Sequence, residues 1–402
     1  MKLVVIITKG RSGALFLQSL LDSHPRFFSI PSHILRSFYN GWFSKYEYEK
    51  IDNLILKFIE DHDFLFNKTN QQFIEAGFVN MGQNQDENIS VNKQVFFQNF
   101  KKLCKKTDSL ISRREFFIKL HQTYAKTIDQ DIRKVDTIIY YLHDYEPKLA
   151  PQILNDFPET KFIHLMRKPL QTTFSLIHHL YSRNIFEHKR NYAIIRCFRN
   201  LLWIFPLRED CFNISCFIKL EDLHSNPRIV MEKLSNFIGI EWNDCLLKST
   251  LNGKLWWNFS TGINVIGFNK QTTKKNRFEH LSTKFDRIRL SSILMPFYVL
   301  FEYDTQEYET KENINKYIAL LFVFFYPFKF EILGFRSSDW GQIDKNKSYN
   351  YINKLFFVFK NFINLRILLL RIFLLIHYGF KPSKKPNFIK FIDLKKNIIP
   401  FL

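Results

Sequence analysis

Residues 2–22 read KLVVIIT, then KGRSG, then ALFLQSLLD. The first stretch is a run of Leu, Val and Ile of the length expected for a strand buried on both faces. Gly10 and Gly13 permit a tight turn, and the leucines after them have helical spacing. A strand, a small-residue turn and a helix place free backbone N–H groups at a positive helix end, so this stretch predicts a binding site for a phosphate or sulfate group.

The turn between this strand and this helix is basic, but it is not a Walker A loop. Arg11 adds a positive charge to it. A Walker A loop ends in Gly-Lys-Ser/Thr, whereas Gly13 is followed by Ala14 and Leu15, so no hydroxyl is placed for magnesium. By itself, the tetrad Gly-Arg-Ser-Gly is equally compatible with an ordinary turn that carries a solvated arginine.

A second segment repeats the pattern of strand, basic turn and helix. Residues 161–166 read KFIHLM, and Arg167-Lys168-Pro169 precedes an apolar stretch. Ser175 follows Arg167 by eight residues, which is about two helical turns, and can share a face with it if the helix begins near Pro169.

A third segment, residues 217–227, reads FIKLEDLHSNP. It precedes an amphipathic stretch from Arg228 to Ile238, and Gly239 predicts the end of that helix. Three segments in one chain therefore combine an apolar strand with a polar or basic turn and a helix, which is typical of an α/β protein.

In this order the segments resemble the sulfotransferases that use 3′-phosphoadenosine 5′-phosphosulfate (PAPS). KGRSGAL (9–15) resembles their 5′-phosphosulfate loop, and Arg167 to Ser175 resembles their 3′-phosphate motif, which is Arg, Asp or Asn, Pro, five residues and Ser. KLEDLHSNP (219–227) resembles their Tyr-Glu-Asp-Leu block. LNGKLWW (251–257) and TGINVIGF (261–268) resemble late segments of bacterial members, so the resemblance covers about residues 1–305.

The resemblance implies an α/β, P-loop-like three-layer fold with a central parallel sheet flanked by helices. Residues 1–310 would form the sulfotransferase domain, with an acceptor-site insertion at about 26–135, and residues 311–402 a basic, aromatic-rich helical extension. The implied activity is the transfer of a sulfuryl group from PAPS to a hydroxyl or amine of a carbohydrate or lipid-linked acceptor.

The resemblance also implies which residues bind the donor. Arg11 would stabilise the leaving group, because a guanidinium can donate two parallel hydrogen bonds to phosphosulfate oxygens. Arg167 and Ser175 would hold the 3′-phosphate, which distinguishes PAPS from ATP, and a basic run after residue 268 would lie near the same phosphate. The implied donor site comprises Lys9, Gly10, Arg11, Ser12, Gly13, Ala14, Leu15, Arg167, Ser175, Lys274, Lys275 and Arg277.

Three positions depart from the family pattern. The two residues after the loop's second glycine are usually hydroxylic, so with Ala14 and Leu15 two hydrogen bonds, each worth roughly 1.5–3 kcal/mol where desolvated, would be missing. Lys168 replaces the usual Asp or Asn. These departures leave a second function open, a non-catalytic binder of PAPS or adenosine 3′,5′-bisphosphate. A P-loop kinase is disfavoured by the missing Gly-Lys-Ser/Thr.

The transfer also needs a base that removes the acceptor proton. Residues 136–141 predict a strand that leads to His143, where cytosolic relatives place a catalytic histidine, and an imidazole with a near-neutral pKa suits that role. Asp144 or Glu146 is the fallback, because other relatives use a carboxylate, and His121 is a third candidate. No metal is expected, since cationic side chains and backbone donors can stabilise the transferring charge. His164, inside an apolar strand, is expected in the core.

The formal net charge is +20, and about half of it lies near the C-terminus. Ile343 to Leu402 contains twelve Lys or Arg against two Asp, a net of +10. A basic face attracts nucleic acid, anionic lipid or anionic substrates. No nucleic-acid-binding module is present, so we expect the extension either to pack on the core or to make a peripheral contact with an anionic membrane, and expect no nucleic-acid partner.

Cysteine usage and the N-terminus indicate the compartment. The five cysteines lack metal-ligand spacing, and an odd number does not suggest a disulfide framework. The apolar N-terminal stretch predicts a strand rather than a signal peptide, because the phosphate-binding turn follows it directly. We therefore expect reduced thiols and a cytoplasmic location.

Overall fold

The computed structural model describes residues 1–30, 34–67, 69, 78–104, 109–143, 149–201, 213–258, 265–269, 281–301, 303, 318, 322–323 and 326–333. The predicted basic run at Lys274, Lys275 and Arg277, the fallback bases Asp144 and Glu146, and the extension from residue 334 onward lie outside these residues.

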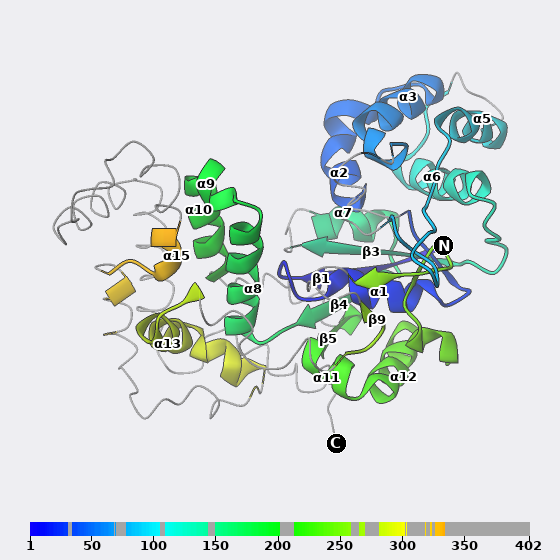
Figure 1. The fold of residues 1–402 in the computed structure, drawn as a ribbon. Helices are drawn as coiled ribbons and strands as arrows, with labels where there is room; N and C mark the ends of the chain where they lie inside the picture. Colours follow the sequence, from blue (N-terminus) through cyan, green and yellow to red (C-terminus); the bar gives the residue numbers. More distant parts are fainter. Residues whose placement is uncertain are drawn as a thin grey trace.

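A five-stranded sheet forms the centre of the fold (Figure 1). Its strands lie in the order β2-β3-β1-β4-β5, and every neighbouring pair is parallel. Helices flank the sheet, so the predicted α/β architecture is confirmed. The strands are β1 (Lys2–Thr8), β2 (Phe27–Phe28), β3 (Thr137–His143), β4 (Lys161–Met166) and β5 (Ser215–Lys219).

The sheet is surrounded by helices from both halves of the chain. They are α1 (Ala14–Asp22), α2 (Ile34–Gly41), η1 (Trp42–Tyr46), α3 (Ile51–Asp61), η2 (Asp63–Leu65), α5 (Lys93–Leu103), α6 (Arg113–Thr127), α7 (Leu149–Asp156), α8 (Pro169–Ser182), α9 (Ile185–His188), α10 (Arg190–Leu201), α11 (Leu220–Ser225), α12 (Pro227–Ile238), η4 (Asp244–Leu247), α13 (Lys284–Leu300) and α15 (Lys329–Leu333). Two short hairpins follow η4, namely β6 (Thr250–Leu251) with β7 (Lys254–Leu255), and β8 (Trp257–Asn258) with β9 (Val265–Ile266).

The strand order places a ligand-binding edge at the ends of β1, β3 and β4. β1 lies between β3 and β4, and the chain fills the β3 side of the sheet before it crosses to the β4 side. In open parallel sheets, ligands bind beyond the carboxyl ends of the strands at such a change of direction. Thr8, the last residue of β1, pairs with His143 and with Leu165, so the turns after all three strands meet at one edge.

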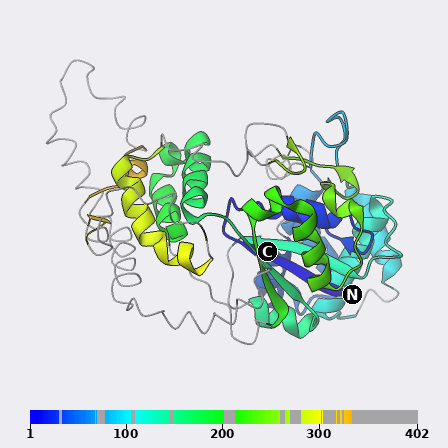
Figure 2. The same ribbon diagram turned by 90° about the horizontal axis from the view of Figure 1, so that it is seen from below.

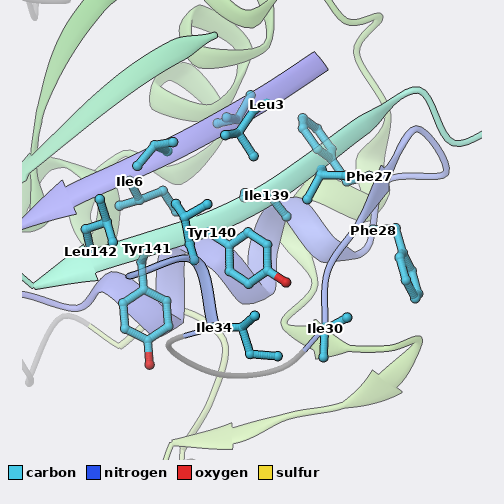
Figure 3. Close-up of a cluster of buried hydrophobic side chains, with 14 of the residues drawn as sticks. Leu3, Ile6, Phe27, Phe28, Ile30, Ile34, Ile139, Tyr140, Tyr141 and Leu142 are labelled. Atoms are coloured by element: carbon cyan, nitrogen blue, oxygen red, sulfur yellow. The ribbon is translucent and has the colours of Figure 1, made fainter. Parts of the chain in front are cut away.

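The main hydrophobic core lies around β1 and β3. Figure 3 shows Leu3 and Ile6 of β1 beside Ile139 and Leu142 of β3, with aromatic side chains from both β2 and β3 next to them. All six residues from Leu3 to Thr8 are buried, which explains why β1 has no polar alternation.

A second core joins α8, α10 and α13 to the ends of β4 and β5. Figures 1 and 2 show these helices packed together beyond the carboxyl ends of the strands. Val323, Phe328 and Phe330 belong to the same core. Arg289, which is fully buried in α13, donates hydrogen bonds to the carbonyl oxygen of Tyr326 (2.6 Å) and to Asp286 Oδ1 (2.5 Å). The described residues beyond position 311 are therefore anchored on α13. No helix in the described part of the chain is long and apolar enough to cross a membrane.

The LNGKLWW segment forms the hairpin between β6 and β7. Asn252 and Gly253 both have positive φ (48° and 76°), as the two central residues of a type I′ turn require. Asn252 also donates to the carbonyl oxygen of Ser29 (3.0 Å) and accepts from the Tyr124 hydroxyl (3.1 Å). The hairpin is thereby attached to α6, in the predicted acceptor-site insertion.

Candidate active site

The loop between β1 and α1 has the backbone conformation of an anion-binding turn. Arg11 has φ 72° and Gly13 has φ 85°, while Ser12 between them lies outside the left-handed region. Such alternation turns successive N–H groups toward one concave space, and here α1 begins directly behind it. A left-handed arginine is uncommon, and residues held in such a conformation cluster at functional sites.

Gly13 also lies against the third segment, directly beside the Leu220 side chain. A Cβ atom built on Gly13 would lie 2.7 Å from Leu220 Cδ1, closer than real side chains approach. Around Gly10, no atom lies within 4 Å of such a Cβ in the described part of the chain. Leu220 is the first residue of α11, so the KLEDL stretch supports the loop from behind.

Arg167 joins the second predicted segment to the first. Its Nη1 donates a hydrogen bond of 3.0 Å to the carbonyl oxygen of Arg11. Burial and, to a smaller extent, the positive charges of Arg167, Arg183 and Arg196 together lower the pKa of the Arg11 guanidinium to about 10. Arg11 thus lies in a site that concentrates positive charge at the carboxyl edge of the sheet.

Glu221 of the KLEDL stretch fixes the turn that carries Arg167. Its Oε1 accepts a hydrogen bond of 3.0 Å from the backbone N–H of Lys168, and its Oε2 accepts one of 3.2 Å from the Tyr303 hydroxyl. The Tyr298 hydroxyl accepts from the N–H of Leu170 at 3.2 Å. The first N–H groups of α8 are therefore held by side chains that lie far away in the sequence.

Two predicted donor-site hydroxyls are buried at this edge. Ser175 lies on α8 and is 6% exposed, and Ser12 lies in the loop and is 1% exposed. Ser12 Oγ has no hydrogen-bond partner among the residues that the structure describes. A buried hydroxyl without a partner is costly, and a phosphate or sulfate oxygen in the loop would accept a hydrogen bond from it. The residues present therefore fit the phosphosulfate group of the donor.

The remaining loop residues show what the departures from the family pattern change. Lys9, Gly10 and Leu15 are half-buried, and the Ala14 side chain is buried at the start of α1. The methyl group of Ala14 packs in the core and supplies no hydrogen bond. An anion in this loop would therefore find its donors in backbone N–H groups, Ser12 and Arg11, and none in the side chain of Ala14.

The segment that precedes the predicted basic run lies against α1. His224 stacks on Phe16 with ring centroids 4.7 Å apart, and its Nδ1 accepts a hydrogen bond of 3.1 Å from the N–H of Asn269. Phe268 packs edge-on against Phe16 at 5.4 Å. Burial lowers the pKa of His224 to about 4, and the charge of Arg167 contributes to the shift. Residues 268 and 269 are thus held against Phe16 and His224, and the charge of Arg167 reaches His224.

His143, the first candidate for the base, lies at the carboxyl end of β3. It is the last residue of β3, it pairs with Thr8 in the register of β1, and it is half-buried. Since neighbouring strands lie about 4.8 Å apart, its backbone is adjacent to the start of the loop. Its ring packs against Tyr141 at 5.1 Å.

His121 and His164, the two other histidines considered from the sequence, lie in the core. His121 is fully buried, and its ring nitrogens bond the carbonyl oxygen of Phe117 and the hydroxyl of Tyr140, both at 2.7 Å. Burial lowers its pKa to about 4. This placement argues against His121 as the base. His164 is buried and stacks on Phe217 at 4.6 Å, as the sequence predicts for a core residue.

Three basic residues near the site were not predicted from the sequence. His179 lies near the end of α8, Arg183 caps that helix, and Arg196 lies on α10. Burial lowers the pKa of His179 to about 3, and the charges of Arg11, Arg183 and Arg196 contribute. The only signal in the sequence was the four-residue spacing of Ser175, His179 and Arg183, which puts them on one helix face.

The described residues show no metal centre. No three His, Cys, Asp or Glu side chains among them are grouped as metal ligands would be. The site is built from arginines, backbone N–H groups and hydroxyls, which is the chemistry of an anion-binding site.

Comparisons with known proteins show which proteins the chain is similar to. The chain is similar to the sulfotransferase domain from the curacin biosynthetic pathway (15% identity, 68% of this chain and 89% of that chain, TM-score 0.36). It is similar to the sulfotransferase domain of the Synechococcus PCC 7002 olefin synthase (16%, 76% and 95%, TM-score 0.42) and to a sulfotransferase from Alicyclobacillus acidocaldarius (12%, 77% and 99%, TM-score 0.35). A comparison with curated proteins gives no significant match. The family model described as "Sulfotransferase family" matches residues 4–244, which is more than half of this chain. The chain therefore belongs to the sulfotransferase family.

Proposed function

We propose that this sulfotransferase moves a sulfuryl group from PAPS to a hydroxyl or amine of a carbohydrate or lipid-linked acceptor. The observation that carries the proposal is the hydrogen bond from Arg167 to the carbonyl oxygen of Arg11, since it unites the two segments that resemble the phosphosulfate loop and the 3′-phosphate motif. PAPS would supply a sulfuryl group activated by a good leaving group.

The chain's own residues would bind and orient this donor. Arg11, Ser12 and the backbone N–H groups of the loop would neutralise the charge that develops on the leaving phosphate. Arg167 and Ser175 would hold the 3′-phosphate, and the basic run at Lys274, Lys275 and Arg277 is proposed to lie near it. Because guanidinium and N–H groups provide this stabilisation, the proposal requires no metal.

We propose His143 as the general base. Its place at the end of β3, next to the start of the loop, would let a neutral imidazole take the proton from an acceptor hydroxyl as the sulfuryl group arrives. Asp144 and Glu146, directly after it in the sequence, remain the alternatives.

A second candidate function is the binding of PAPS or adenosine 3′,5′-bisphosphate without catalysis. It is favoured by the buried methyl group of Ala14, which stands where relatives place a hydroxyl. Binding through the backbone and Arg11 would survive this substitution, whereas transition-state stabilisation could be lost.

Two measurements test these functions. Thermal shift with adenosine 3′,5′-bisphosphate, AMP and ATP should show the largest stabilisation for the bisphosphate, because a ligand that binds only the folded state raises its stability by mass action. Equal shifts for the bisphosphate and AMP would contradict donor binding. Transfer of radiolabelled sulfate from PAPS to a mixed acceptor extract then separates the enzyme from the non-catalytic binder.

A further inference from the structure

The polar face of α8 continues beyond the residues that resemble the 3′-phosphate motif. Ser175, His179 and Arg183 follow one another at intervals of four residues, so they line one face of the helix. Arg183 lies eight residues after Ser175, which corresponds to about 12 Å along the helix axis. This face therefore extends well past the residues assigned to the donor.

The packing of α10 on α8 adds a second arginine to this end of the helix. Asn200 Nδ2 donates a hydrogen bond of 3.3 Å to Thr173 Oγ1, which fixes how the two helices lie against each other. Arg196 is one turn before Asn200 on the same face of α10. Because α10 returns along α8, Arg196 comes level with the turn of α8 that leads to His179. Its guanidinium donates to the exposed Tyr192 hydroxyl at 3.2 Å.

These groups lie within reach of one another's charge and of the charge of Arg11 in the loop. The pKa of His179 is lowered first by burial and then by the charges of Arg11, Arg183, Arg196 and His178. The same two arginines shift the pKa of Arg11. Every charged group that shifts the pKa of Arg11 or His179 is cationic, so positive charge gathers around both residues.

The donor residues do not account for this charge. Arg11, Arg167, Ser12 and Ser175 already provide for the two anionic parts of PAPS. Arg183 and Arg196 are exposed. A solvent-exposed pair of arginines whose charges reach Arg11 can meet a second, separate anion.

We propose that Arg183 and Arg196 form an acceptor subsite, which receives a carboxylate or phosphate carried by the molecule to be sulfated. This inference rests on the proposed function and names the acceptor class: a hydroxyl compound with its own negative charge near the hydroxyl. A guanidinium matches either group with two parallel hydrogen bonds.

The test measures binding of matched sugars to the full chain saturated with adenosine 3′,5′-bisphosphate, by titration calorimetry. The probes are 4-nitrophenyl β-glucoside, its 6-phosphate and 4-nitrophenyl β-glucuronide, which differ only at carbon 6. We expect at least one charged probe to bind roughly tenfold more tightly than the glucoside, and the comparison of the two charged probes distinguishes carboxylate from phosphate.

The double variant Arg183→Gln, Arg196→Gln should lose that roughly tenfold preference, because it removes both charges of the subsite. Both are replaced together because each exposed charge pair contributes only modestly to binding. Arg199→Gln, an exposed arginine on the same helix, should retain it. The double variant should keep its affinity for the bisphosphate within about threefold, well below the effect of losing a charge-assisted bond.

Equal binding of charged and neutral probes, or no binding of any probe, would overturn the subsite. So would a double variant that loses nucleotide affinity but keeps the preference for charge, because the arginines would then serve the donor. A wild-type chain that does not bind the bisphosphate would instead contradict the proposed function, and the preference measured without nucleotide would still decide the subsite.

Discussion

Arg167 Nη1 lies 3.0 Å from the carbonyl oxygen of Arg11, a residue 156 positions earlier in the chain. The two residues follow neighbouring strands, β4 and β1, so the parallel sheet brings their turns together. The carbonyl of Arg11 is available to Arg167 in a loop whose backbone is left-handed at Arg11 (φ 72°). The conformation of the loop at Arg11 and the position of Arg167, the residue proposed to bind the 3′-phosphate, are therefore coupled.

Replacing Arg167 by alanine should weaken the binding of adenosine 3′,5′-bisphosphate far more than the binding of AMP. The 3′-phosphate would lose a charge-assisted hydrogen bond worth roughly 1.5–3 kcal/mol, which corresponds to a tenfold or larger change in Kd. Titration calorimetry with both nucleotides measures this. Arg167→Lys keeps the charge but not the forked geometry, so we expect an intermediate loss. Equal losses for both nucleotides would show that Arg167 acts only through the loop.

Gly13→Ala should destabilise the protein, whereas Gly10→Ala should not. A Cβ on Gly13 would meet Leu220 at 2.7 Å and would force a non-glycine residue into φ 85°, while the space around Gly10 is open to such an atom in the described structure. Destabilisation of roughly 1–3 kcal/mol is typical of a residue added to a well-packed position. Denaturant unfolding of the two variants measures the difference. Similar unfolding midpoints would mean that the loop can move away from α11.

The sequence predicts the parts of the fold that depend on short, local patterns. β4 begins and ends at the predicted residues 161–166, and α8 begins at Pro169 as expected. Gly239 ends α12 with φ 83°, in the left-handed conformation that a glycine cap adopts. β3 runs two residues beyond the predicted Tyr141, because Leu142 and His143 still pair with β1.

The rest of the site depends on tertiary packing that no local pattern encodes. Glu221 accepts a hydrogen bond from Tyr303, 82 residues later, and Arg196 reaches the site only because α10 packs on α8. His121 has the chemistry of a base, but it lies on the buried face of α6, where its ring bonds the hydroxyl of Tyr140 in β3. Spacing alone could identify the phosphate-binding segments, but it could not show which other charges surround them.

His143→Ala should lower turnover by roughly 10²–10⁴-fold while nucleotide affinity stays nearly unchanged, because a general base acts on the acceptor and not on the donor. Sulfate transfer and bisphosphate binding, measured on the same preparation, check both halves of this prediction. If the variant remains active and Glu146→Ala abolishes transfer, the carboxylate is the base. A loss of nucleotide affinity in His143→Ala would instead indicate a role in supporting the adjacent loop.

Asp22 at the end of α1 should make stability depend on pH. Burial raises the pKa of this carboxyl from 3.8 to about 6, although hydrogen bonds from Thr250 and from the N–H groups of Asn252 and Gly253 oppose the rise. Because the folded state holds the proton more tightly than the unfolded chain, the free energy of unfolding should fall by roughly 3 kcal/mol as pH rises from about 4 to about 6, and Asp22 adds no further slope above that range. Denaturant unfolding at intervals across this range measures the slope, and Asp22→Asn, which cannot ionise, should flatten it. Parallel curves for the wild type and the variant would mean that Asp22 ionises normally in the folded protein.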